Sequence, residues 1–363
     1  MKHRQEPPKP IDEPWTMDEL QSEFERIVRE VQDAGKTLTA KLMVSVADQT
    51  TKSAGRAFYR TLIETAPDML ADRRKELEGF ERRNLRRWRK AFDLIETIFV
   101  SCEELGREFN QHHRPTAIAE QDYVFEAMTY LHAKALLVTA EIICLLKGGF
   151  ADGALTRWRT LYETNVVAFL LRQEGQDLAL RYLAHSRVQA WNEAQDEKGN
   201  TEERQRLEVQ AEYAIEKFGP ELKRRNGWAC AITGQKHPTF EKLAELAGKA
   251  DGKSLYRHAS LHVHSNHRAL DELLGMCETQ EDVLLVGPSN SGMVGPLTLT
   301  AMSIVESTML LLLTKPNLDR LAFVNALLRM ANRMNKLASG IERRTFEAAQ
   351  RRKAVVRDKL TAK

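Results

Sequence analysis

The segment from Tyr256 to His267 holds four of the ten histidines in the chain, and an arginine, Arg257, near its start. A histidine with an ordinary pKa of about 6.5 can accept or donate a proton at neutral pH. An arginine can neutralise the charge that develops on a phosphate during transfer. Arg257 with His262 or His264 is therefore the minimum set of groups for phosphodiester chemistry without a metal.

The spacing of these residues leaves the choice of histidine open. Seven residues separate Arg257 from His264, about 700° around a helix axis, so both would lie on nearly the same helix face. Ser260 would lie on that face one turn before His264. Five residues separate Arg257 from His262, about 140° around the axis, unless the helix opens or begins there.

Two charged residues on another predicted helix could support this site. Arg159 and Glu163 are one helical turn apart. If their helix packs on the Tyr256 helix, Glu163 can orient a histidine or pair with Arg257, and Arg159 can contact phosphate. The alternative is an ordinary ion pair on a half-buried helix face.

Two parts of the chain resemble a known superfamily. The residues from Arg257 are similar to the R-x4-H and R-x6-H forms of the HEPN (higher eukaryotes and prokaryotes nucleotide-binding) ribonuclease signature, with the polar His258 after the arginine. Gly153 to Glu163 and the Y-x3-S-x3-H pattern of 256–264 resemble two helices of an uncharacterised bacterial all-helical family. The similarity covers roughly residues 120 to 315.

This resemblance implies a central HEPN-like helical bundle and a metal-independent endoribonuclease whose site is shared by a homodimer. RNA would be the substrate, and no cofactor would be needed. Arg257 would stabilise the transition state, and His264 or His262 would transfer protons, the usual R-x4-H spacing favouring His262. Ser260, Arg159 and Glu163 would be supporting groups. Such enzymes act in antiphage defence or toxin–antitoxin systems, so an antitoxin or defence protein is an expected partner.

Other patterns in the sequence favour different chemistry only weakly. A second R-x4-H match, Arg107 to His112, lies at a predicted helix end. No H-E-x-x-H pattern and no ferritin-like Glu-x-x-His pair occurs in the core helices, so we expect no catalytic metal. The loop 287–292 lacks the Lys-Ser/Thr of a phosphate-binding loop. The competing hypothesis is a noncatalytic helical module that binds nucleic acid or a protein.

The elements that must position these residues are predicted to be helices. Apolar residues recur at spacings of three and four, and the low content of 19 Gly and 11 Pro disfavours a sheet. We expect an all-α fold with a flexible tail (1–15), a long helical arm (16–114) broken near Pro67 and ending before Pro115, a core (115–315) and a C-terminal basic helix (316–363). Within the core, glycines at 148, 175, 199 and 219 are predicted to end helices, 225–238 to be a loop, and 256–274 to be helical.

The distribution of charge indicates where RNA could bind. The chain has 54 Lys and Arg against 51 Asp and Glu, a net charge of only +3. Segments 73–90 and 336–363 each hold nine basic and three acidic residues, which leaves the rest of the chain at −9. We predict phosphate contacts from Arg86, Arg87, Arg351 and Arg352, with ordinary solvated helix faces as the alternative.

Composition also indicates a compartment. The chain has 363 residues, 42% of them hydrophobic, which fits a globular protein of one or two domains. Its longest apolar runs are shorter than the roughly 18 residues of a membrane span, and its first residues lack the apolar part of a secretion signal. Four scattered cysteines form no zinc or disulfide pattern. We therefore expect a cytoplasmic protein.

Overall fold

The computed structural model describes residues 18–35, 37, 39–196, 201–263, 272–278 and 284–361, except the side chains of 196, 201 and 352–361. All regular elements among these residues are helices, so the predicted all-α class is confirmed. The predicted tail, residues 1–15, lies outside the described residues. The chain divides into two compact units, Met1–Leu77 and Glu78–Lys363.

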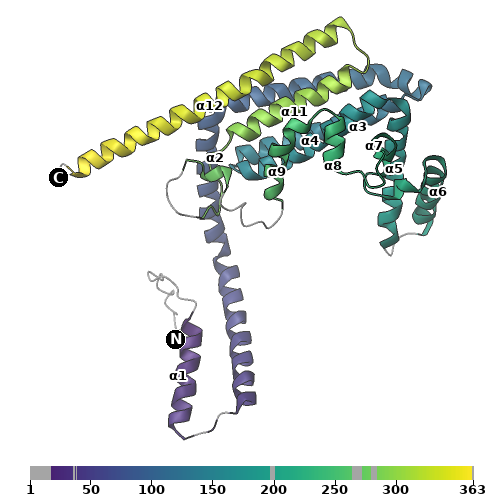
Figure 1. The fold of residues 1–363 in the computed structure, drawn as a ribbon. Coiled ribbons are helices and arrows are strands. Elements are labelled where there is room, and N and C mark those ends of the chain that lie inside the picture. The colour runs from purple at the N-terminus through teal and green to yellow at the C-terminus, as the bar shows by residue number, and fades with distance from the viewer. Residues whose placement is uncertain are drawn as a thin grey trace, which may run out of the picture. The chain divides into compact units, whose positions relative to one another are not determined.

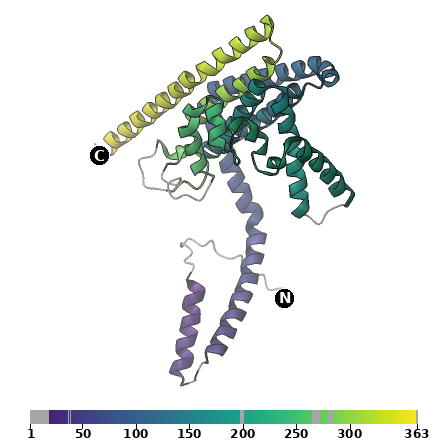
Figure 2. The same ribbon diagram turned by 45° about the vertical axis from the view of Figure 1, so that its right-hand side comes forward.

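The first unit is a helical hairpin. Helix α1 (Glu19–Asp33) lies beside the first turns of α2 (Ala40–Glu120), and both views show the two helices running in opposite directions (Figures 1 and 2). Phe24, Val28 and Val31 of α1 are half-buried at spacings of four and three. This unit is therefore held together along one narrow seam.

Helix α2 continues through both prolines that were expected to interrupt it. It spans 81 residues and includes Pro67 and Pro115, so the predicted break and the predicted early end are wrong. A proline costs a helix one hydrogen bond and some crowding, which packing on either side can offset. Around Pro115, Phe109 and Ala117 are both buried in the core. The helix ends instead at Glu120, and the next residue, Gln121, has a left-handed φ of 53°.

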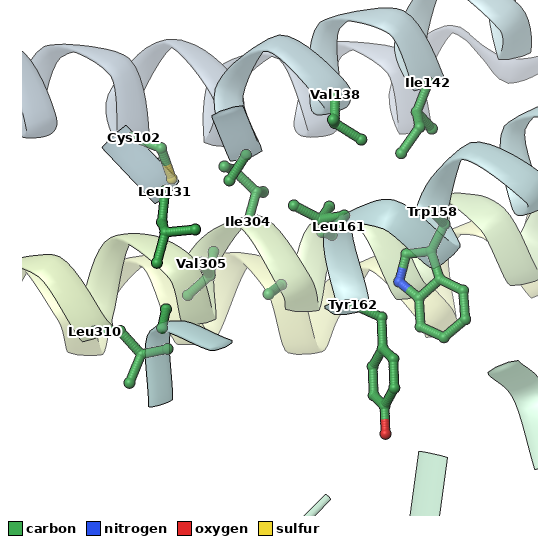
Figure 3. Close-up of a cluster of buried hydrophobic side chains, with 14 of the residues drawn as sticks. Cys102, Leu131, Val138, Ile142, Trp158, Leu161, Tyr162, Ile304, Val305 and Leu310 are labelled. Carbon is green, nitrogen blue, oxygen red and sulfur yellow. The ribbon is translucent and has the colours of Figure 1, made fainter. Parts of the chain in front are cut away.

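The core of the second unit is formed by long helices that pack on one another. They are the second half of α2, α3 (Tyr123–Lys147), α4 (Ala151–Glu174), α11 (Val294–Leu312) and α12 (Leu318–Thr361). Figure 3 shows apolar side chains from four of these helices, α2, α3, α4 and α11, meeting between them. Residues 84–109, predicted as part of the arm, supply Trp88, Phe92 and Ile95 to this core. The boundary between compact units therefore follows Leu77 and not residue 114.

Two core helices are apolar over a longer stretch than the apolar runs in the sequence indicated. By length and composition, α3 and α11 could each cross a membrane. In this fold 44% and 61% of the residues in their most apolar windows are buried. The buried residues of both helices contact the other core helices.

Shorter helices connect α4 to α11. They are α5 (Gln176–Asp196), α6 (Thr201–Phe218), η1 (Pro220–Lys223), η2 (Gly227–Ala229), α7 (Cys230–Thr233), α8 (Phe240–Leu246), η3 (Ala250–Gly252), α9 (Lys253–Leu261) and η4 (Leu274–Met276). The stretch 225–238, predicted as a loop, contains two of these short helical turns. Helix α9 ends at Leu261, earlier than the predicted residue 274, and residues 264–271 lie outside the described residues.

Three of the four predicted glycine stops are confirmed. Helix α3 ends at Gly148, α4 at Gly175 and α6 just before Gly219. Gly175 and Gly219 have φ values of 82° and 98°, which side chains with a Cβ rarely adopt. Gly199 lies outside the described residues.

Burial of His132 makes the stability of the fold depend on pH. Its ring is 4% exposed, its Nε2 lies 3.0 Å from the Thr308 hydroxyl, and burial lowers its pKa to about 4. The unfolded state takes up a proton on His132 near pH 6.5, whereas the folded state does not. The contribution of the neutral His132 to the free energy of unfolding is therefore complete above pH 6.5. It is lost progressively as the pH falls towards about 4, with a total of about 3 kcal/mol.

We expect His132→Gln to flatten this dependence. Urea unfolding of both proteins at pH 7 and pH 5 measures it, because the difference between the two proteins removes the contributions of other groups. Equal losses of stability in the wild type and the variant would contradict the assignment to His132.

Candidate functional site

The candidate site is built where η3 and α9 pack on α4. A Cβ at Gly252 would lie 2.8 Å from the Tyr162 ring, so only glycine allows this close approach. The Tyr162 hydroxyl donates a hydrogen bond of 2.6 Å to the carbonyl of Lys249. The residues that precede α9 are thereby fixed against α4, and the side chains of α9 take defined positions.

Arg257 lies on the exposed side of α9. Its Nη2 is 3.1 Å from Glu241 Oε1 of α8, and its side chain is 64% exposed. Lys253 also reaches Glu241, at 3.4 Å. Hydrogen bonds from Arg257 and Lys253 lower the pKa of Glu241. Exposed ion pairs of this kind contribute little stability, so a phosphate can replace the glutamate as the partner of Arg257.

His262 occupies a different and enclosed position at the end of α9. Its side chain is 6% exposed, and its Nε2 is 3.9 Å from Asp152 Oδ1, too far for a hydrogen bond. Among the described residues this nitrogen has no hydrogen-bond partner. Burial lowers the pKa of His262, and the neighbouring His258 adds to this effect, whereas the charges of Asp152 and Glu272 oppose it. His262 is therefore neutral at physiological pH.

Asp152 is a member of this cluster that the sequence analysis missed. Its two carboxylate oxygens accept hydrogen bonds from the amides of Leu274, at 2.7 Å, and Gly275, at 3.2 Å. Asp152 thus joins the first turn of α4 to η4 and places a negative charge beside His262. The only hint in the sequence was an acidic residue in the first turn of a predicted helix. Such residues are common because they stabilise helices, so Asp152 did not indicate a site.

The structure does not bring Arg257 and His262 of one chain together. Arg257 contacts α8, whereas His262 faces the start of α4, as the 140° between them on a helix implies. His264, the other candidate, lies outside the described residues. The Ser260 hydroxyl donates to the carbonyl of Tyr256 at 2.7 Å, which occupies its proton within α9.

Arg159 and Glu163 pack against α9, but with a partner that was not expected. Glu163 Oε1 accepts hydrogen bonds from Arg159 Nε at 3.0 Å and from the Tyr256 hydroxyl at 2.6 Å. The Arg159 guanidinium lies 4.8 Å from the centre of the Tyr256 ring. Burial and Glu163 raise the pKa of Tyr256 to about 12. Glu163 therefore fixes Tyr256, and among the described residues it forms no hydrogen bond or ion pair with Arg257.

A pocket of about 400 Å³ opens between α4, α8 and α9, and its lining includes Glu241, the partner of Arg257. Its wall includes three aromatic residues, Tyr162, Phe240 and Tyr256, whose ring centres are 4.8 to 6.0 Å apart. Lys253 and Glu241 stand at its edge. An aromatic wall suits a planar ring such as a nucleic-acid base. The three rings come from distant parts of the sequence, so no local pattern predicted this pocket.

The predicted phosphate contacts differ in what they can bind. Arg87 is only 11% exposed and bonds to Glu278 and, at 3.0 Å, to Asn290 Oδ1. Arg87 therefore forms a structural ion pair, contrary to the prediction that it contacts phosphate. Arg86 is exposed, and Arg351 is 81% exposed with Glu347 3.6 Å away. The side chain of Arg352 lies outside the described residues.

No three His, Cys, Asp or Glu side chains of the described ranges lie close enough together to form a metal site.

Residues 125–282 match a family of unknown function, DUF5677. This range contains α4, α8 and α9, and so the whole of the candidate site. No curated protein and no solved structure matches the chain. The chemistry of the site therefore has to be argued from its residues.

The geometry around His262 predicts how its pKa responds to substitution. The Asp152 carboxylate favours the protonated ring, so Asp152→Asn should lower a pKa that is already below 6.5. NMR titration of the His262 ring carbons measures this, with circular dichroism to verify the fold. Glu347→Gln, an exposed carboxylate on α12, is the control and should leave the value unchanged. A rise in the Asp152→Asn variant would show that this carboxylate does not act on His262.

Proposed function

We propose that the protein is a metal-independent endoribonuclease related to the HEPN superfamily, with a site shared by two chains. The observation that carries this proposal is the position of Arg257, whose exposed side chain pairs with Glu241, one of the residues that line the aromatic pocket. This is the arrangement that a nucleotide needs, because the rings can stack on a base while the guanidinium binds the adjacent phosphate.

The reaction would be the attack of an RNA 2′-hydroxyl on the neighbouring phosphorus. A histidine removes the hydroxyl proton, the bond from the 2′-oxygen to phosphorus forms, and the bond to the 5′-oxygen breaks. A second histidine donates a proton to that leaving oxygen. The products are a 2′,3′-cyclic phosphate and a 5′-hydroxyl. Arg257 stabilises the charge on the pentacoordinate phosphorus.

A site shared by two chains would resolve the separation of Arg257 and His262 on one helix. Arg257 of one chain would then work with His264 or His262 of the partner subunit. The lowered pKa of His262 suits a proton acceptor, because the ring is neutral before the reaction. Arg159 and Glu163 would act as positioning residues, since they fix the Tyr256 ring of the pocket wall.

One observation favours a second function, a module that binds nucleic acid and does not cleave it. The imidazole of His262 is 6% exposed, so RNA cannot reach it without a movement of the surrounding residues. In this case Arg257, the aromatic pocket and the exposed Arg86 and Arg351 would bind RNA without proton transfer. We place either activity in the bacterial cytoplasm, in antiphage defence or a toxin–antitoxin system with a partner protein.

Expression of the wild type beside Arg257→Ala, His262→Ala and His264→Ala tests the nuclease. We expect wild-type protein to generate RNA ends with 2′,3′-cyclic phosphates, unaffected by EDTA, and Arg257→Ala to reduce cleavage by about 100-fold or more. Sequencing of RNA with cyclic phosphate ends after induction or phage challenge measures this. Arg225→Ala, an exposed arginine outside the site, is the matched control.

Cleavage that survives in Arg257→Ala would contradict the proposed role of this residue. RNA that binds to the wild type and to the Arg225→Ala control but is never cut, before or after challenge, would favour the binding module. Loss of activity in only one of the two histidine variants would identify the histidine that transfers the proton.

A further inference from the structure

The first unit exposes an apolar surface that its own helices do not cover. None of the described residues between 18 and 77 is buried. Helix α1 has 15 residues, a length of roughly 22 Å, whereas α2 runs on to Leu77 within this unit, a length of roughly 57 Å. The half-buried residues of α2 next to α1 end at Ala54. Among the described residues, α1 is too short to run beside α2 much beyond this point.

The uncovered part of α2 carries a regular apolar seam. We define the arm seam as Tyr59, Leu62, Ala66 and Met69, which follow one another at spacings of three, four and three. Tyr59, Leu62 and Met69 are 67%, 61% and 55% exposed. Alternating spacings of three and four place residues on one helix face and are typical of coiled coils.

A helical hairpin without a buried residue lacks the packing that keeps helices folded. Most helical stability in proteins comes from burying an apolar face, and α1, with only 15 residues, is marginally stable by itself. Monomeric proteins rarely leave a continuous apolar stripe in solvent. The arm seam is therefore expected to be covered in the functional protein.

The seam is complementary to a second copy of itself in the antiparallel direction. When Leu62 faces the partner's Ala66, Tyr59 faces the partner's Met69, so a large side chain meets the smallest one in the centre. One layer further out Gly55 faces the partner's Arg73, and beyond it Lys52 faces the partner's Glu76. Opposite charges then close both ends of the seam.

A parallel pair would fit less well. It would place each seam residue against the same residue of the partner, so that two Ala66 side chains leave a gap in the centre. It would also bring Arg73 against the partner's Arg73 and Lys52 against the partner's Lys52. Like charges that face each other are destabilising, and a gap forfeits contacts.

The area of this surface is sufficient for a dimer. The three large seam residues, with Ile63 and Leu70 beside them at 58% and 40% exposure, present on the order of 500 Å² per chain if a fully exposed side chain has about 200 Å². Two copies would bury roughly 1,000 Å², at the lower limit for a specific interface. Flanking side chains would add to this area.

We propose that the arm seam of α2 is the interface of an antiparallel homodimer. This inference does not rest on ribonuclease activity, because it concerns only the first unit. A dimer that forms through the seam but does not cleave RNA would contradict the proposed function and leave the interface intact.

Light scattering after size-exclusion chromatography of the full chain tests the interface. We expect the wild type to be a dimer at micromolar concentration, and Leu62→Glu to raise the dissociation constant by about 100-fold or more, because two carboxylates would be buried in the seam. Thr61→Glu adds the same charge one residue away on the outer face and should remain a dimer. Ala66→Glu is a second seam variant if Leu62→Glu does not fold, as judged by circular dichroism.

A photo-crosslinking residue at position 59 tests the direction. Mass spectrometry of the crosslinked dimer should find the link near the partner's Met69 and not near the partner's Tyr59. A monomeric wild type, or equal dimerisation of Leu62→Glu and Thr61→Glu, would overturn the interface. Crosslinks between equivalent residues would overturn the antiparallel arrangement.

Discussion

The packing of α9 on α4 is the contact on which the candidate site depends. Helix α4 has two roles, because Trp158 and Leu161 are buried in the core while Tyr162 and Glu163 contact the segment that carries Arg257. The absence of a side chain at Gly252 allows the two to approach closely. If this contact were lost, the aromatic wall, the Glu163 hydrogen bonds and the exposed position of Arg257 would be lost together.

Local patterns predicted the class of fold and several helix ends correctly. Low glycine and proline content with apolar spacings of three and four indicated helices, and glycine stops at Gly148 and Gly175 were found where expected. The prediction at Pro115 was wrong because the rule that proline breaks helices considers only neighbouring residues. Phe109 and Ala117, buried on either side of Pro115, hold the helix together through contacts that no short window of sequence contains.

The site was predictable only where partners are close in sequence. The Arg159–Glu163 pair is four residues apart and is present in the fold. Tyr256 as its third member, and Asp152 beside His262, depend on how helices pack, and therefore could not be inferred. Arg87 shows the opposite error, since a basic run suggested an exposed residue, whereas this side chain forms a half-buried ion pair with Glu278.

Lys249 connects the site to the centre of the molecule in two directions. Its carbonyl accepts the Tyr162 hydrogen bond from α4, and its ammonium pairs with Glu306 on α11, which in turn accepts a hydrogen bond from Asn165. The start of α9 is thus tied to two core helices at one residue. Local opening of the segment that leads into α9 would have to break both ties, so this segment is held as firmly as the core helices it contacts. The binding surface would then select ligands by a fixed shape and not by folding around them.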